Sequence, residues 1–159
     1  MDENFELNLD KKVTLRSIAP WETSFARYTE MGDVVIAPLG SVRVSRAEII
    51  AQHQNNNKLI NGIDGMGTHA TLFIDDVDTR KEIGFDSEDG KTKQFVFSDD
   101  LVKKIFEYKT QSAFEQHFVE SFVTRAEKKA VMSAIKRLKI NDFSKIRFAE
   151  KYTGFRCED

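Results

Sequence analysis

The sequence predicts an α+β protein, in which a small, mainly antiparallel β domain is followed by a helical C-terminal region. In the first part of the chain, apolar residues alternate or form short runs, as they do in strands. From Ser98 onward they recur every three or four residues, as they do in helices. We therefore expect a β-rich domain over residues 1–97, with one short inserted helix, and a helical region over residues 98–159 that packs on it.

The first predicted elements are strands. Residues 13–18 lie near alternation, residues 34–36 form a short apolar run, and residues 41–44 alternate cleanly. A capping box follows at residues 45–48, where the Ser hydroxyl can accept from the Glu amide and the Glu carboxylate can accept from the Ser amide. We expect a short helix to run from this box towards Gln54.

A glycine-rich segment after this helix predicts a β-hairpin. Its strands are expected at residues 58–63 and 69–74, with a tight reversal between them. Glycine enters the positive-φ region without a steric clash of a Cβ atom, which is what such a reversal needs. The glycines in question are Gly62, Gly65 and Gly67.

Two further elements are expected before the helical region. A second capping box at residues 79–82 predicts one or two helical turns ahead of Gly84. After a charged loop, residues 94–97 are expected to form a last short strand.

The helical region is expected to contain about four helices. The first covers residues 101–108, the third opens at a capping box at residues 124–127, and the last begins near Asp142 or Ser144. The second carries three phenylalanines at a spacing of four, which we expect to be buried at the junction of the two halves: Phe114, Phe118 and Phe122.

Composition excludes several classes of protein. The net charge of −2 argues against a polycationic protein, although residues 1–97 carry 11 Lys and Arg against 16 Asp and Glu, and residues 98–159 carry 13 against 10. Cys157 is the only cysteine, so no internal disulfide can form. The N-terminal residues show no signal-peptide pattern and no run of about 18 apolar residues occurs, so we expect neither secretion through a signal peptide nor a membrane protein.

The glycine-rich segment also holds residue types that enzymes use. A strand that ends in carboxylates, here Asp75, Asp76 and Asp78, is a geometry used for Mg²⁺-dependent phosphoryl chemistry, and His69 could act as a general base. The alternative is that these carboxylates, with Asp64, support a turn and cap a helix, with Asp78 or Thr79 as the cap. Because no metal-ligand spacing, nucleophile with its base or phosphate loop occurs, we predict no catalytic residue, no metal site, no cofactor and no enzymatic activity.

A basic segment in the C-terminal region is the other candidate site. Between residues 124 and 151, nine Lys and Arg accompany only three Asp and Glu. Two helices joined by a short link could place several of these cations along a phosphate backbone, or the cations could form the solvated outer face of an amphipathic helical hairpin. The nine are Arg125, Lys128, Lys129, Lys136, Arg137, Lys139, Lys145, Arg147 and Lys151.

Four runs of sequence resemble a group of known proteins. Residues 15–22, 36–50, 57–70 and 124–154 are similar to uncharacterised proteins of tailed bacteriophages. The resemblance implies a bacteriophage context and carries no active-site motif with it. Proteins of this size in that context are often virion accessory parts, such as capsid, neck or tail components.

Two functions are expected from these observations. The first is a non-enzymatic phage virion or assembly component, a structural protein that acts through protein-protein contacts with other virion proteins or with itself. The alternative is a nucleic-acid-binding accessory protein that uses the basic helical hairpin. Neither a membrane nor a small-molecule substrate is expected as a partner, and the expected location is the virion or the cytoplasm of the bacterial host.

Overall fold

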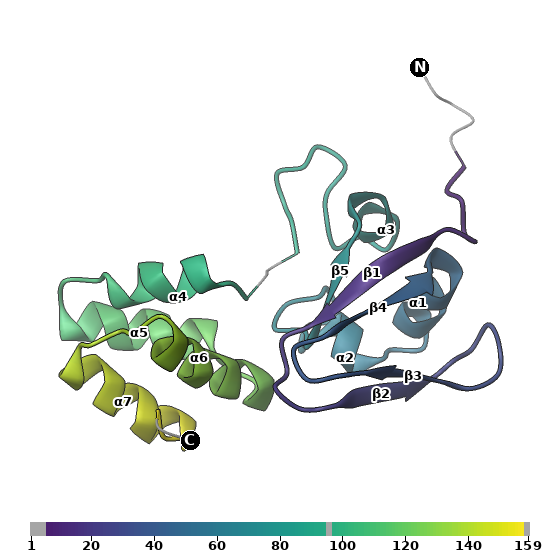
Figure 1. The fold of residues 1–159 in the computed structure, drawn as a ribbon. Coiled ribbons are helices and arrows are strands. Elements are labelled where there is room, and N and C mark those ends of the chain that lie inside the picture. Colours follow the sequence, from purple (N-terminus) through teal and green to yellow (C-terminus); the bar gives the residue numbers. More distant parts are fainter. Residues whose placement is uncertain (1–5, 95–96, 158–159) are drawn as a thin grey trace. The chain divides into compact units, whose positions relative to one another are not determined.

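The computed structural model describes residues 6–94 and 97–157 (Figure 1). Its described residues form two compact units, one of residues 6–17 and 21–94 and the other of residues 18–20 and 97–157. The first unit contains antiparallel sheets and the second is mainly helical, which confirms the predicted α+β class.

The first unit contains a three-stranded antiparallel sheet and a separate two-stranded ribbon. In the sheet β1 is the central strand, with Leu15 opposite Val42 on one neighbour and Ile74 on the other. Residues 13 and 15 of β1 are buried because alternate side chains of a strand face the same side. The sheet consists of β4 (Ser41–Ser45), β1 (Lys12–Ser17) and β5 (Leu72–Asp75), and the ribbon of β2 (Thr23–Ala26) and β3 (Asp33–Ile36).

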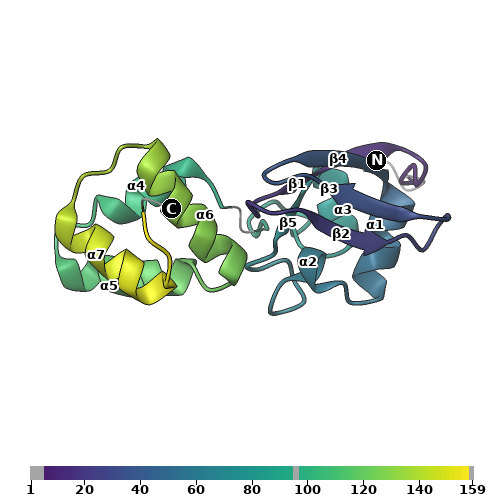
Figure 2. The same ribbon diagram turned by 60° about the horizontal axis from the view of Figure 1, so that its bottom comes forward.

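Three helices accompany these strands, where the sequence predicts one inserted helix and a turn or two near residue 80 (Figure 2). The predicted box before the first helix forms only in part. Ser45 accepts from the Glu48 amide at 3.1 Å, but the Glu48 carboxylate bonds elsewhere. The helices are α1 (Arg46–Gln54), α2 (Lys58–Asn61) and α3 (Val77–Glu82).

The buried carboxylate of Glu48 instead holds the turn between β2 and β3. It accepts from the backbone N–H of Tyr28 and of Thr29, both at 3.0 Å, from the Thr29 hydroxyl at 2.6 Å, and from Gln52 Nε2 at 2.8 Å. Burial raises the pKa of Glu48, but the hydrogen bonds from Thr29, Tyr28 and Gln52 outweigh it and keep this pKa below its ordinary value. The carboxylate therefore stays ionised and ties the tip of the ribbon to α1.

The predicted hairpin is wrong. Residues 58–61 form α2 rather than a strand, because the Asn57 side chain accepts from the Leu59 amide and starts a helical turn. The strand that follows begins only at Leu72 and pairs with β1. The intervening loop does contain the expected positive-φ glycines, Gly62, Gly65 and Gly67.

The cap of α3 differs from the predicted one, and the last predicted strand of this unit lies partly outside the described residues. The side chain of Asp76 caps α3 by accepting from the Thr79 amide at 3.0 Å, so the predicted caps Asp78 and Thr79 are wrong by two or three positions. The strand predicted at residues 94–97 includes residues 95 and 96, which lie outside the described residues.

The second unit consists mainly of the predicted four helices, and its helical spacing begins where expected. Ser98 caps the first helix, Thr124 and Glu127 form a complete capping box on the third, and Asp142 caps the last. Gly154 ends the last helix with a φ of 77°. The helices are α4 (Asp99–Phe106), α5 (Gln111–Ser121), α6 (Arg125–Arg137) and α7 (Phe143–Thr153), and α7 contacts both α5 and α6.

Aromatic side chains form the core of the helical unit. Phe114, Phe118 and Phe122 are fully buried, which confirms that part of the prediction. Their ring partners include Phe106, Phe148 and Tyr152, so the stripe packs inside the core of this unit. Within the described part of the chain, no helix has the length and apolar character needed to cross a membrane.

Candidate nucleic-acid interface

The carboxylates singled out in the sequence have separate structural roles. Asp64 supports a turn, since it accepts from the backbone N–H groups of Met66 at 2.8 Å and Thr68 at 3.3 Å. Asp76 caps α3 and also forms an ion pair with the buried Arg46 at 3.0 Å. These are the turn and capping roles that the sequence predicts for this group.

The other members of that group also have local structural contacts, and Asp78 shares the Arg46 guanidinium with Asp76. Asp75 pairs with Arg16 at 3.7 Å on the surface, and Asp78 lies 3.6 Å from Arg46. His69 has a φ of 58° and precedes β5 rather than lying in a strand. Among the described residues, no group of three or more His, Cys, Asp or Glu is placed to hold a metal ion.

Two of the nine predicted basic residues are engaged inside the protein. Lys145 is only 8% exposed, and its ammonium donates to the carbonyls of Phe106 at 2.7 Å and Tyr108 at 2.6 Å. It therefore holds the C-terminal end of α4 and cannot meet a phosphate. Arg137 is half-exposed and forms an ion pair with Asp99 of α4.

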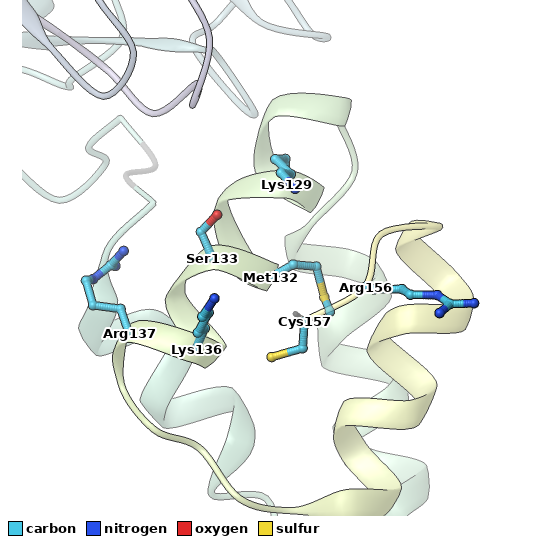
Figure 3. A pocket seen from close by; sticks show the side chains of 7 residues that line it. All are labelled: Lys129, Met132, Ser133, Lys136, Arg137, Arg156 and Cys157. Carbon is cyan, nitrogen blue, oxygen red and sulfur yellow. The ribbon is translucent and has the colours of Figure 1, made fainter. Parts of the chain in front are cut away.

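Three other cations gather where the C-terminal tail folds back between α6 and α7. Lys129 and Lys136 line a pocket of about 300 Å³ together with Arg156 of the tail, and Cys157 and Met132 lie at its centre (Figure 3). The tail is held there because the Cys157 amide donates to the Glu150 carboxylate at 3.0 Å. Arg137 also lines this pocket, but its side chain extends away from Cys157 in Figure 3.

A second pocket, of about 500 Å³, joins the first through Arg156. Arg147 and Lys151 of α7 contribute its other cations, and among the described residues Glu150 is the one acidic residue that lines it. Six cations therefore line two pockets that share Arg156, and five of them, all except the ion-paired Arg137, remain as candidates to bind an anion. We call this set the basic track: Lys129, Lys136, Arg156, Lys151 and Arg147.

Arg156 is the member of the basic track that the sequence pattern misses. It lies five residues beyond the segment in which the basic excess was noticed, after the helix stop at Gly154. The signal that could have found it is charge alone, because residues 124–157 hold ten Lys and Arg against three Asp and Glu.

Three cations of α6 and α7 lie over aromatic rings. Lys128 Nζ lies 4.7 Å from the centre of the Tyr152 ring, Lys129 Nζ lies 4.9 Å from that of Phe155, and the Arg147 guanidinium carbon lies 5.9 Å from that of Phe143. Such contacts hold long, flexible cationic side chains in extended positions. The rings thus help to position these three cations.

The basic track can attract and bind anions. Lys and Arg donate charge-assisted hydrogen bonds to phosphate oxygens, and several of them on one face bind a phosphate backbone.

The remaining predicted residues, Arg125, Lys128 and Lys139, lie on α6 or directly after it. No family model matches the chain, and neither a curated protein nor a solved structure matches it.

Proposed function

We propose that the protein is a nucleic-acid-binding accessory protein whose helical unit contacts the phosphate backbone. The observation that supports this proposal is the basic track, in which five cations from α6, α7 and the tail line two adjoining pockets. Of the two functions expected from the sequence, the geometry supports this one better.

The spacing of the cations suits a phosphate backbone. Arg147 and Lys151 lie four residues apart on one face of α7, which places their backbones about 6 Å apart along the helix axis. Lys129 and Lys136 are seven residues apart on α6, again on one face and about 10 Å apart along the axis. Since the whole chain has a net charge of −2, a polyanion is attracted to the cations of this face and not to the protein surface as a whole.

Charge reversal in the basic track tests the proposal. The double substitution Lys129→Glu and Lys136→Glu should weaken binding to DNA or RNA by a similar factor for every sequence, because phosphate contacts carry no sequence information. It should also flatten the dependence of the logarithm of the binding constant on that of the salt concentration, by about one per lost cation. Fluorescence anisotropy with labelled oligonucleotides over a range of salt concentrations measures both effects.

The matched control changes the same charge elsewhere on the unit. Lys103 of α4 and Lys109 after it are exposed and line neither pocket, so Lys103→Glu with Lys109→Glu should reduce the affinity less. Equal losses for both double variants would show that only the net charge matters. Wild-type protein that leaves every oligonucleotide unbound at low salt would contradict the proposal.

The second candidate is the virion or assembly component that acts through protein-protein contacts. Exposed apolar side chains on and beside the β2–β3 ribbon favour it, with Met31 at 95% exposure in the turn. Large apolar side chains gathered on one surface feature are typical of protein interaction sites. The others are Tyr28, Val35 and Leu39.

If this candidate is correct, the ribbon should mediate association. Size-exclusion chromatography with light scattering, with the chain alone and with purified phage structural proteins, should then show a complex that Met31→Glu with Val35→Glu disrupts. Val119→Glu, which places a charge at an exposed apolar position on α5, serves as the control. A strict monomer that is absent from purified particles would rule this candidate out.

A further inference from the structure

We infer that the basic track binds single-stranded nucleic acid in preference to duplex, and that Phe143 is the platform on which one base stacks. This inference rests on the proposed nucleic-acid-binding function and adds the class of substrate. It depends on one exposed ring and on its position relative to the cations.

Phe143 is exposed to an unusual degree for its residue type. Its side chain is 74% exposed, and it is the only exposed phenylalanine among the described residues. The other phenylalanines of the helical unit are buried or half-buried in or beside its core. Phe143 is the first residue of α7, where Asp142 supplies the cap, so the ring is not needed to start the helix.

The ring lies in line with the cations of α7. Phe143, Arg147 and Lys151 are spaced by four residues, which places them on one face of the helix. The stretch from the first to the last covers about 12 Å along the helix axis, which is long enough for a stacked base and the phosphates beside it. The Arg147 guanidinium carbon lies over one face of the ring, 5.9 Å from its centre. A base can therefore stack on the opposite face, and Arg147 can bind a phosphate next to it.

This arrangement distinguishes single-stranded nucleic acid from duplex. Every base has a π face that can stack on an aromatic ring, so the contact tolerates any sequence. In a duplex the bases are stacked on one another and paired, and they cannot reach a ring on a protein surface without being extruded. Phosphate contacts are made by both forms, so Phe143 contributes affinity for single strands alone.

The test compares one labelled thymidine oligonucleotide with a duplex of the same length in anisotropy titrations. Wild-type protein should bind the single strand more tightly. Phe143→Ala should weaken single-strand binding about tenfold and leave duplex binding unchanged within about twofold. Phe143→Trp should retain single-strand binding, whereas Phe143→Leu, which is apolar but has no π face, should behave like the Ala variant. The salt dependence should be the same for all four proteins, because no cation is removed.

Val123→Ala, at another partly exposed apolar position of the helical unit, is the control for general effects of truncation. Phe143→Ala protein that binds single strands as tightly as wild type would overturn the inference and leave the proposed function intact. Equal losses for both forms, or loss of a self-association that the ring mediates, would also overturn it, since the ring would then support the fold or a protein contact. Wild-type protein that binds neither form would contradict the proposed function itself.

Discussion

Phe118→Ala should destabilise the helical unit by about 3–5 kcal/mol, because truncating a fully buried phenylalanine removes its transfer free energy and leaves a cavity. The ring is 0% exposed and lies against five other aromatic rings, with centroid separations from 4.8 Å to Phe122 up to 6.1 Å to Phe106. Urea denaturation followed by circular dichroism at the helix band measures the loss.

The neighbouring position provides the control for Phe118→Ala. Val119 follows on the same helix but is 39% exposed, so Val119→Ala should change the free energy of unfolding by about 0.5 kcal/mol or less. Similar unfolding midpoints for the two variants would contradict the aromatic core described above.

Asp86→Asn should destabilise the first unit by about 3–5 kcal/mol, because it leaves a buried guanidinium without its counter-charge. Asp86 accepts from Arg80 Nε at 3.0 Å and from the Gln94 amide at 2.9 Å, and both charged side chains are at least nine-tenths buried. Arg80 also donates to the Ile74 carbonyl at 2.7 Å on β5. The fluorescence of Trp21, the only tryptophan and a member of this unit, reports the unfolding.

A surface ion pair in the same unit gives the matched comparison. Arg16 and Asp75 lie 3.7 Å apart and are each about half-exposed, so Asp75→Asn should cost at most about 1 kcal/mol. Replacing both members of the buried pair, with Arg80→Met and Asp86→Leu, should restore part of the stability lost in Asp86→Asn. Equal losses for Asp75→Asn and Asp86→Asn would contradict this account of the buried pair.

The parts of the fold that local sequence determines were predictable. A helix cap involves residues within four positions of one another, which is why Ser98, Thr124 and Asp142 mark helix starts in the sequence as in the structure. The same applies to the aromatic stripe on α5, because a spacing of four defines a helix face.

The hairpin prediction failed because strand pairing is not local. The segment after Asn57 alternates weakly, and the Asn57 cap is enough to start a helical turn there. The strand that was expected to pair with it, β5, pairs instead with β1. There Ile74 lies opposite Leu15, which is far from it along the chain. Nothing within the segment itself specifies that partner.

The sequence predicts a cluster of Lys and Arg in the helical unit, but it does not predict which of these residues line the basic track. Lys145 carries the same charge as its neighbours, but its acceptors are two carbonyls at the end of α4, 37 and 39 residues earlier in the chain. Arg156 joins the site only because the tail folds back onto Glu150. Both facts depend on tertiary structure. Counting charges along the sequence therefore includes Lys145, which is buried, and misses Arg156.

Under the second candidate function, the buried carboxylate of Glu48 would also set the entropic cost of binding a partner at the ribbon. The backbone N–H groups of Tyr28 and Thr29 are fixed by this carboxylate, while the side chains of Tyr28 and Met31 extend into solvent. A turn whose backbone is already ordered loses less conformational entropy when a partner binds it, so a larger share of the contact energy remains as affinity. Below the lowered pKa of Glu48 the carboxylate gains a proton, and the turn would then have to be ordered at the moment of binding.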